Sequence, residues 1–375
     1  MTIKKSLVIG GGISGLTAGA ALARRGIDVD LVEIKKALGD QGGVGLSIMG
    51  NASKALATIG AAEACVRAGM PADVFTVRAP TGEVIAVPPW PALGKPKWPA
   101  QIGISRADFH EILSNAATSA GVNVYCDTTT QSIDDGETQA HVVFTDGRRG
   151  DYDLIVAADG IYSATRSQLF PEVTGPQRTG LAIWRALVPR PDGITTTQLH
   201  FGGPQGVVGV CPINESDCYL YCIHEAFEGE RRDPTTLHTQ LREKIEGYGG
   251  LIPALASQIN DPANVSYRPL EWMLVPAPWY RGRVVLIGDS AHANPPNVAQ
   301  GAAMGIEDAV VLAEEVSNTG TLASALACFM TRRFSRVQLV VEVSCRVAKN
   351  QVEHTPGFDA AAEITRASTA LAEPY

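Results

Sequence analysis

Short apolar runs and helix-like stretches alternate at the start of the chain. Residues 5–9 (KSLVI) form a β-rich apolar run, which is typical of a strand buried on both faces. Behind a cluster of glycines, LTAGAALARRG has the composition of a helix and ends at Gly26, a frequent helix terminator. Residues 27–33 (IDVDLVE) read as the next strand. The pattern predicts a β-α-β unit of about 30 residues.

The same alternation continues up to about residue 160. A helix is predicted from near Asn51 and another over 104–121, where Ser105 is a suitable N-cap. A strand at 122–126 and a hairpin plus buried strand at 140–160 follow. Strands alternating with helices in this way are typical of a parallel sheet covered by helices.

The pattern changes near Gly180. Several short segments with period-two or aromatic character follow, among them LAIWRALVP, GVVGVCPI and CYLYCIH, and they favour an antiparallel sheet. The run 281–289 (RGRVVLIGD) returns to the buried-strand style, and long helical segments are predicted at 301–316 and 321–349. The chain is therefore predicted to contain an interrupted parallel-sheet unit with an antiparallel sheet inserted into it.

Composition limits the classes of function. The chain has 375 residues, of which 45% are hydrophobic and 19% charged, and its net charge is −8. This length favours two domains, and the negative charge disfavours nucleic acid and anionic membranes as partners. No apolar run approaches the roughly 20 residues of a membrane span. Seven cysteines without a C-x-x-C pair favour reduced thiols in a cytoplasmic protein and predict no metal site.

The glycines after the first predicted strand have the spacing G-x-G-x-x-G. Gly10 allows a tight turn, Gly12 lets the backbone approach a pyrophosphate, and Gly15 lets the helix pack on the strand. The helix N-terminus offers free N–H groups to phosphates, and Glu33 is placed to accept from ribose hydroxyls. A glycine-rich turn that only permits close packing is the alternative, but the strand, helix and acid around it favour FAD or NAD over NADP. The expected ligand-binding residues here are Gly10, Gly12, Ile13, Ser14, Gly15 and Glu33.

A second strand-to-helix junction, VVLIGDSAHANPPNVAQGAAMGIEDA, begins at Val284. Asp289 ends the predicted strand, where ligands bind in open α/β sheets, and could accept from ribityl hydroxyls. The Pro295–Gly301 turn would present backbone N–H groups and a helix N-terminus to the pyrimidine end of a flavin, where negative charge develops on reduction. This junction favours FAD over NAD.

With these residues in view, the chain resembles the single-component FAD-dependent aromatic-ring hydroxylases, the group of p-hydroxybenzoate and salicylate hydroxylases. The resemblance rests on the first glycine motif, on AADGIYSATR, and on the stretch from Val284, in that order. Weaker matches are GVGLSIMGNASKAL, SRADFHEIL and LAIWRALVP. It extends over nearly the whole chain.

The resemblance implies roles for further residues around the cofactor. Arg106 would contact FAD on the pyrophosphate side, and Asp289 the ribityl–phosphate region. Asp159 belongs to a segment tied to FAD and NAD(P)H handling, although it is equally compatible with a structural pair with Arg166. The remaining expected cofactor residues are Gly45, Pro296, Gly301 and Ala302.

Two positions depart from the family pattern. Ala299 stands where a glycine is frequent and would restrict the loop, and Gly50 stands where a proline is common. Neither departure argues against FAD.

The implied reaction is a monooxygenation. NADH or NADPH binds transiently and reduces FAD, O₂ adds at flavin C4a to give a hydroperoxide, and a hydroxyl is placed on a small aromatic or N-heteroaromatic ring. The enzyme would act as a monomer or homodimer. A flavin-dependent reductase or dehydrogenase of the same fold, and a non-catalytic FAD-binding protein, are the rival functions.

The substrate pocket is predicted between the flavin and the antiparallel sheet. Period-two alternation places Tyr219 and Tyr221 on one face of a strand and His224 on the other. A phenol facing inward would orient the substrate or relay its proton, and His224 is the alternative base, while aromatic sheet packing remains open for each. Further expected substrate contacts are Ser47, Cys211, Arg185 and Pro296. A neutral phenol or hydroxylated N-heterocycle fits these residues as well as a benzoate.

The expected fold class is α/β, with a Rossmann-like FAD-binding domain containing a parallel sheet, an antiparallel-sheet substrate domain and C-terminal helices. The FAD-binding domain would be discontinuous, comprising residues 1–80, 100–180 and 275–315. Residues 81–99 and 181–274 would form the substrate domain, and residues 316–375 the helical region.

Overall fold

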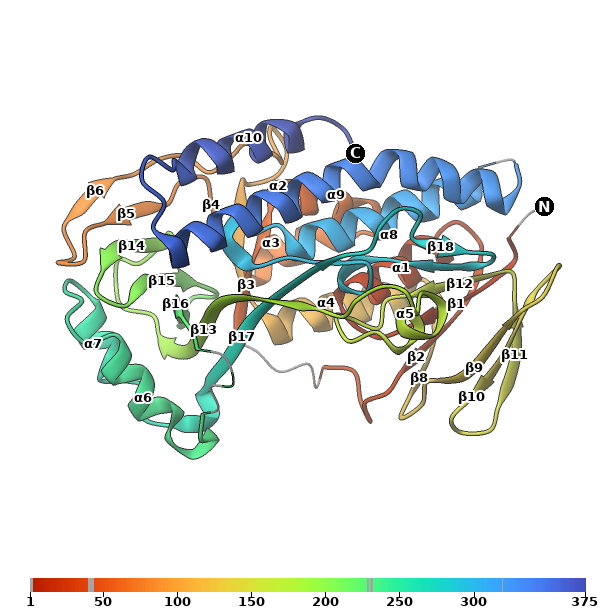
Figure 1. The fold of residues 1–375 in the computed structure, drawn as a ribbon, viewed down its shortest axis with the longest axis horizontal. Helices are drawn as coiled ribbons and strands as arrows, with labels where there is room; N and C mark the ends of the chain where they lie inside the picture. Colours follow the sequence, from red (N-terminus) through yellow and green to blue (C-terminus); the bar gives the residue numbers. More distant parts are fainter. Residues whose placement is uncertain (1–2, 40–43, 228, 230–231, 319) are drawn as a thin grey trace.

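A six-stranded sheet forms the centre of one half of the molecule (Figure 1). The computed structural model describes residues 3–39, 44–227, 229, 232–318 and 320–375. All neighbouring strands of this sheet are parallel except the outermost pair, β18 and β19. In spatial order the strands are β18 (Tyr280–Arg281), β19 (Val284–Leu286), β12 (Leu154–Ala157), β1 (Lys5–Ile9), β2 (Asp28–Glu33) and β8 (Asn123–Cys126).

Helices cover one face of this sheet, and a small antiparallel sheet covers the other. Val8 packs with the helices, whereas its neighbours Leu7 and Ile9 pack with the antiparallel strands, as period-two alternation requires. The covering sheet consists of β9 (Thr130–Asp135), β10 (Ala140–Phe144) and β11 (Arg149–Tyr152). The main helices are α1 (Ile13–Ala23), α4 (Arg106–Ser119) and α8 (Gly301–Ser317).

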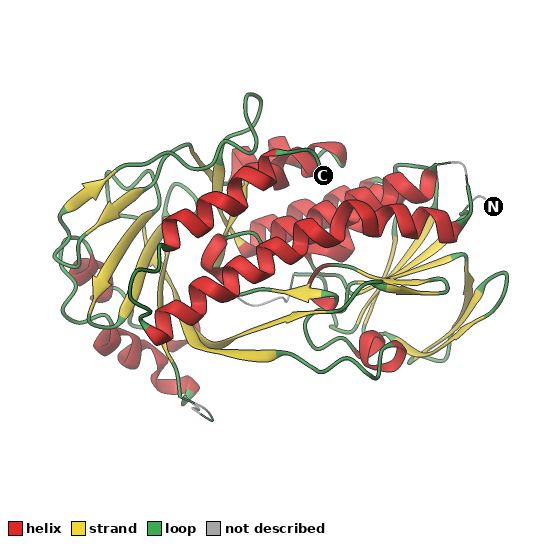
Figure 2. Cartoon of the chain, turned by 45° about the horizontal axis from the view of Figure 1, so that its top comes forward, coloured by secondary structure: helices red, strands yellow, loops and turns green. Residues whose placement is uncertain are grey.

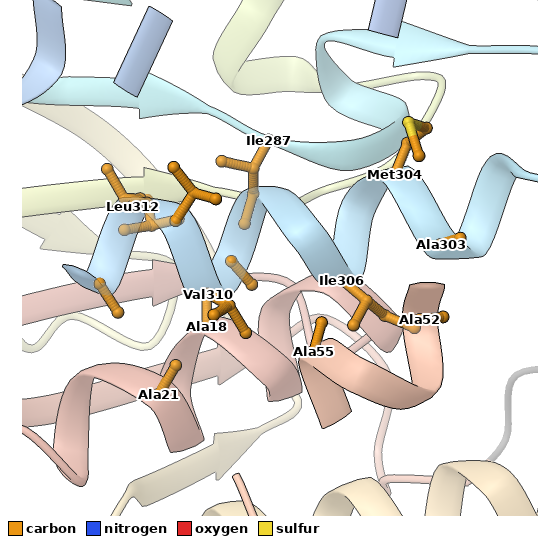
Figure 3. Close-up of a cluster of buried hydrophobic side chains, with 14 of the residues drawn as sticks. Ala18, Ala21, Ala52, Ala55, Ile287, Ala303, Met304, Ile306, Val310 and Leu312 are labelled. Atoms are coloured by element: carbon orange, nitrogen blue, oxygen red, sulfur yellow. The ribbon is translucent and has the colours of Figure 1, made fainter. Parts of the chain in front are cut away.

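Small side chains let α8 lie close to the start of the chain. Ala18 and Ala21 of α1 and Ala52 and Ala55 of α2 (Gly50–Thr58) face Ile306 and Val310 of α8 (Figure 3). The second strand-to-helix junction is therefore packed directly against the first one, although almost 300 residues separate them in the sequence.

An eight-stranded, largely antiparallel sheet forms the other half. Its back face, which carries Trp184 and Leu220, packs against α6 (Leu237–Lys244) and α7 (Ile252–Ala256). Its front face carries Arg185, which pairs in register with Tyr221. In spatial order the strands are β20 (His292–Ala293), β17 (Val265–Leu274), β13 (Gln177–Pro189), β16 (Asp217–Glu225), β15 (Gly206–Pro212), β14 (Gln198–Gly203), β5 (Thr76–Arg78) and β6 (Val84–Ala86).

A three-stranded sheet and two C-terminal helices complete the fold. The long helix α9 (Leu322–Glu353) runs beside α8 and reaches β13 of the large sheet, and α10 (Ala360–Ala372) packs on α9 (Figures 1 and 2). No helix in the described part of the chain is long and apolar enough to cross a membrane. The other elements are β3 (Gly45–Met49), β4 (Met70–Ala72), β7 (Gln101–Ser105), α3 (Ala62–Ala68) and α5 (Ala164–Leu169).

This architecture confirms the predicted fold class, and the main predicted elements are present. Ser105 caps α4 as expected, accepting a hydrogen bond from the backbone N–H of Asp108 at 3.0 Å. The predicted domain division puts residues 1–80 in the first unit, yet β5 pairs with β14 of the large sheet.

Candidate functional site

The first glycine motif forms a tight turn at the end of β1. Gly10 has a φ of +103°, and a Cβ there would lie 2.5 Å from the Ala158 carbonyl oxygen. A Cβ on Gly15 would lie 1.9 Å from the Gly10 oxygen, so only glycine lets α1 approach the strand. Gly12 differs, because a Cβ there would meet nothing within 4 Å. The requirement at Gly12 is therefore not internal packing, and the open side of this residue is free for a ligand.

The N-terminus of α1 opens onto the same side. Gly12 is the N-cap residue of this helix, and no side chain of the described residues caps it. Glu33 is buried at the end of β2, and its carboxylate accepts from the backbone N–H groups of Gly11 at 2.7 Å and Lys35 at 2.9 Å. Uncapped N–H groups at a helix start attract a phosphate. The ribose contact expected of Glu33 stays a prediction.

The second junction lies against the first. Gly288, with a φ of +59°, and Gly305 both leave room for Ser14, whose Oγ would lie 2.3 and 2.2 Å from their added Cβ atoms. The chain then passes through a short 3-10 helix, Pro296–Val298, into α8, which has no side-chain cap. Ser14, which follows the first glycine turn, therefore packs directly against the second junction.

Ala299 adopts the left-handed conformation, with a φ of +53°. Glycine takes this conformation without strain, which accounts for its frequency at this point in the resembled family. The residue precedes Gln300, the N-cap of α8, so its conformation directs the loop into the helix that begins at Gly301 and Ala302.

Arg106 and Asp289 lie close enough to influence each other electrostatically. Burial lowers the pKa of Arg106, and the Asp289 carboxylate opposes that shift. Desolvation raises the pKa of Asp289, while His292 and Arg106 act in the opposite direction. Asp289 is nevertheless exposed to solvent, which lessens the effect of burial on its carboxylate. The Nε of Arg106 is buried and has no hydrogen-bond partner among the described residues.

The Asp159–Gly160 segment is held by local hydrogen bonds. Asp159 accepts from Ser163 Oγ at 2.5 Å and from the Thr165 N–H at 3.0 Å. Arg166 donates instead to the carbonyl oxygens of Ser290 at 3.0 Å and Ile161 at 2.8 Å. The direct structural pair considered for Asp159 and Arg166 is not formed in the described part of the chain. Through Ser290, Arg166 ties this segment to the Asp289 junction.

Tyr219, Tyr221 and Arg185 form the wall that the large sheet presents to this region. The two phenol rings are stacked with centroids 5.3 Å apart, and both residues are partly accessible to solvent. The Tyr219 ring packs on Gly45, where a Cβ would lie 2.7 Å from it. Gly45, expected beside the cofactor, thus contacts the substrate-side wall. Burial raises the pKa of both tyrosines, and Arg185 opposes the shift, so the phenols are protonated at neutral pH.

Ser47 Oγ and Cys211 Sγ, two of the expected substrate contacts, lie 3.9 Å apart, and two further residues join them. Gln101 donates to Ser47 Oγ at 3.0 Å, and Thr197 Oγ1 donates to Cys211 Sγ at 3.3 Å. Burial raises the pKa of the Cys211 thiol, which is therefore neutral. Gln101 is a polar residue in an otherwise apolar buried strand, QIGIS, a signal that sequence reasoning passed over.

His224 is not brought to this site. It lies on the other face of the sheet, where Trp184 Nε1 donates to its Nε2 at 2.9 Å. The sequence placed it on that face, and with the tyrosines turned toward the cofactor side it has no access to a substrate there. Arg268 of β17, by contrast, lies close enough to Arg185 and Arg106 to influence both of them electrostatically, and sequence reasoning missed it.

A buried network of charges anchors α8 behind the site. Arg333 donates to Glu307 at 2.6 Å and to Asp308 at 2.8 Å, and all three side chains are fully buried. Asp308 also pairs with His292 at 2.5 Å. Asn51 extends the network by donating to both Glu307 and Gln300, the N-cap of α8. This network therefore holds the start of α8 and the loop before it in place.

No group of side chains in the described residues has the composition of a metal site. The features described above fit a dinucleotide instead: an open Gly12, an uncapped α1, and a buried Arg106 Nε without a partner.

Comparisons with known proteins agree with this geometry. A family model described as FAD binding domain matches residues 4–342. The chain belongs to this FAD-binding family. It is 33% identical over 345 residues to the aurachin C monooxygenase/isomerase of Stigmatella aurantiaca, covering 92% of this chain and 88% of that protein.

Two further comparisons involve Klebsiella pneumoniae. An FAD-dependent urate hydroxylase is 30% identical over 348 residues, covering 90% of this chain and 88% of the relative. The crystal structure of HpxO complexed with FAD and uric acid matches with a TM-score of 0.84 at 25% identity, covering 99% of this chain and 93% of that one.

These findings confirm the predicted resemblance. FAD is the cofactor, and the protein is an FAD-dependent oxidoreductase of the monooxygenase kind.

Proposed function

We propose that the protein uses NADH or NADPH and O₂ to hydroxylate a small aromatic or N-heteroaromatic ring. The single observation that carries the proposal is the position of the Tyr219–Tyr221–Arg185 wall. Arg185 of this wall lies close enough to Arg106 to be influenced by its charge, and Arg106 is influenced in the same way by Asp289 at the cofactor junction. Polar side chains opposite a flavin site can orient a ring substrate through hydrogen bonds.

The cofactor half of the site would bind FAD through both junctions. The uncapped start of α1 and the Arg106 guanidinium suit the pyrophosphate, and Asp289 suits the ribityl hydroxyls. The N-terminus of α8, beginning at Gly301, would stabilise negative charge at the pyrimidine edge of the ring. When bound, FAD would supply the redox chemistry that activates O₂, with reducing equivalents from NADH or NADPH.

The substrate half would orient the ring. Tyr219 and Tyr221 are protonated, so they serve as hydrogen-bond donors to a substrate oxygen rather than as bases at rest. The Ser47 hydroxyl accepts from Gln101 and lies 3.9 Å from Cys211 Sγ, so these side chains add polar groups to the substrate half. Correct orientation in a site shielded from water keeps oxygen transfer ahead of peroxide release.

The substrate class is supported by the relatives. The names of the urate hydroxylase and of the HpxO complex with uric acid place an N-heteroaromatic ring in a site of this fold. We extend this class, not urate itself, to the present chain.

A panel of phenols, hydroxybenzoates and hydroxypyridines tests the proposal. The FAD-loaded protein is mixed with each compound, and NAD(P)H consumption is compared with H₂O₂ release. A hydroxylated product formed in proportion to NAD(P)H consumed supports the proposal. NAD(P)H oxidation that yields only H₂O₂ with every ring would favour the reductase alternative, and no oxidation at all would favour a non-catalytic FAD-binding protein.

A further inference from the structure

His110 is a buried histidine of α4 that contacts the first glycine turn. Its Nε2 lies 2.8 Å from the carbonyl oxygen of Gly11, and only 3% of the residue is exposed to solvent. A carbonyl oxygen can only accept a hydrogen bond, so Nε2 carries the proton and donates. No other hydrogen bond to the Gly11 oxygen is found among the described residues. A side chain of α4 therefore supplies the donor for a backbone oxygen of the turn.

The N–H groups of this turn differ in how they are used. The Gly10 N–H donates to the Val32 carbonyl oxygen at 2.8 Å, and the Gly11 N–H donates to the Glu33 carboxylate at 2.7 Å. The Gly12 N–H has no acceptor in the part of the chain that the structure describes. An added Cβ on Gly12 would also meet nothing within 4 Å. Gly12 is thus the residue of this turn whose N–H is available to a ligand.

The geometry of the peptide bond connects these two observations. The peptide between Gly11 and Gly12 is planar and trans, so its C=O and N–H groups point in opposite directions. A donor that holds the Gly11 oxygen on the α4 side therefore directs the Gly12 N–H away from α4. Because glycine has wide conformational freedom, a peptide between two glycines rotates readily unless a contact of this kind holds it.

The imidazole of His110 is placed by its own helix. Ser114, one turn further along α4, has its Oγ 3.4 Å from Nδ1 and donates to the His110 carbonyl oxygen at 2.8 Å. Arg106 lies one turn earlier, so Arg106 and His110 share a face of the helix. That face combines a guanidinium, whose buried Nε has no partner in the described residues, with a donor fixed on the glycine turn.

We propose that His110 is a positioning residue for the pyrophosphate of FAD. By donating to the Gly11 oxygen, it holds the Gly11–Gly12 peptide in the orientation that directs the Gly12 N–H at the phosphates. The inference concerns FAD binding alone, so its failure would leave the proposed hydroxylation untouched, and the reverse also holds.

Three substitutions test whether the Nε2–H group is responsible. His110→Gln places an amide N–H near the position of Nε2, so the dissociation constant for FAD should stay within about threefold of the wild type. His110→Asn has the same amide on a side chain that is one methylene too short, and His110→Leu has no donor. Each of these two should weaken FAD binding about 10-fold, the size typical of a hydrogen bond to a charged group. Fluorescence titration of the apoprotein with FAD measures the constants.

His200→Leu is the matched control. His200 is fully buried on β14 of the large sheet rather than beside the glycine turn, so its replacement should leave the FAD affinity unchanged. Melting temperatures of the ligand-free proteins show whether each variant folds. If His110→Leu does not fold, the comparison of His110→Gln with His110→Asn still decides the question, because both keep a polar amide at the buried position.

Phosphorus NMR separates positioning of the turn from packing of the imidazole. The ³¹P resonances of FAD bound to His110→Asn should be displaced from those of the wild type, whereas those of His110→Gln should remain close to them. If the imidazole only fills space, the Gln and Asn variants should lose equal affinity and leave the phosphorus resonances in place. Either that result, or wild-type FAD affinity in both His110→Asn and His110→Leu, would overturn the inference.

Discussion

Two deeply placed arginines have opposite surroundings in this protein. Arg333 lies behind the cofactor loop and is fully buried between Glu307 and Asp308, with a further hydrogen bond to the Met304 carbonyl oxygen at 3.2 Å. Arg185 lies in the substrate wall beside two tyrosines and two other arginines. The first charge is neutralised within the fold, whereas no acid among the described residues forms an ion pair with the second. The difference teaches that charge compensation, more than burial, separates a structural arginine from one available to a ligand.

The electrostatics of the two regions follow from this difference. The acids around Arg333 raise its pKa against the opposing effect of burial, whereas burial lowers the pKa of Arg185 with only the tyrosines opposing. Through Asp308, the compensated network also holds His292, and through Asn51 it holds the N-cap of α8. It therefore holds in place the loop between Asp289 and Gly301, the two residues proposed to contact the cofactor.

The largest effect is expected at the compensated arginine. Arg333→Met removes the cation shared by the buried Glu307 and Asp308 and leaves Arg336 as the partner of Glu307 and His292 as the partner of Asp308, which should reduce the free energy of unfolding by about 3–5 kcal/mol. Urea unfolding of the two proteins measures the difference. Arg332→Met is the control, because its pairs with Glu314 and Glu315 are partly exposed and should contribute about 1 kcal/mol or less. Equal losses for the two variants would contradict the distinction drawn here.

Low pH should weaken the same network of buried charges. The pKa of Asp308 is lowered to about 2 by His292 and Arg333, which outweigh the effect of burial. Because the folded-state pKa lies below the unfolded value of about 3.9, the stabilisation is fully present above about pH 4 and is lost as the pH falls toward 2. It amounts to about 2–3 kcal/mol.

The pH dependence of urea unfolding measures this contribution. Across that window the loss of stability should be steeper for the wild type than for Asp308→Asn. Parallel pH profiles for the two proteins would show that Asp308 is not the titrating group.

Arg106 is the intermediate case, since its charge is partly balanced by Asp289 and its Nε has no partner in the described residues. If FAD supplies that partner, Arg106→Met should weaken FAD binding about 10- to 100-fold. Fluorescence titration of the apoprotein with FAD gives the dissociation constants. A ligand-free melting temperature that stays within a few degrees of the wild type would exclude unfolding as the cause, and unchanged FAD affinity would place Arg106 outside the cofactor site.

The smallest effect concerns the phenols. Tyr221→Phe removes one neutral donor from the substrate wall and keeps the stacked ring, so the KM for the aromatic that is hydroxylated should rise only about 5-fold. Steady-state kinetics of the FAD-loaded protein measure the change. An unchanged KM would show that the Tyr221 hydroxyl makes no hydrogen bond to the substrate.

The cofactor half was largely predictable from the sequence because its elements are local. Gly10, Gly15 and Glu33 belong to one β-α-β unit, and the spacing of these residues in the sequence determines how they are placed in the turn. The junction at Asp289 was predictable for the same reason, since the strand end, the turn and α8 follow one another directly.

The substrate half was less predictable, because its residues come from strands far apart in the chain. Gln101 reaches Ser47 across a sheet, and Arg268 approaches Arg185 only through the pairing of β13 with β17. Nothing local distinguishes Arg333 from any other arginine of a helix; its partners lie 25 and 26 residues away on α8. Such contacts depend on strand order and helix packing. The hydrophobic periodicity and the composition of the sequence do not determine either of these.

Oxygen-18 labelling of the product tests the central claim, hydroxylation of a ring at this FAD site, most directly. The FAD-loaded protein is supplied with NAD(P)H, ¹⁸O₂ and the aromatic that stimulates it most, and the product is analysed by mass spectrometry. The claim predicts a product that carries a single ¹⁸O atom on the ring. Unmodified aromatic with all of the label recovered in peroxide would contradict it.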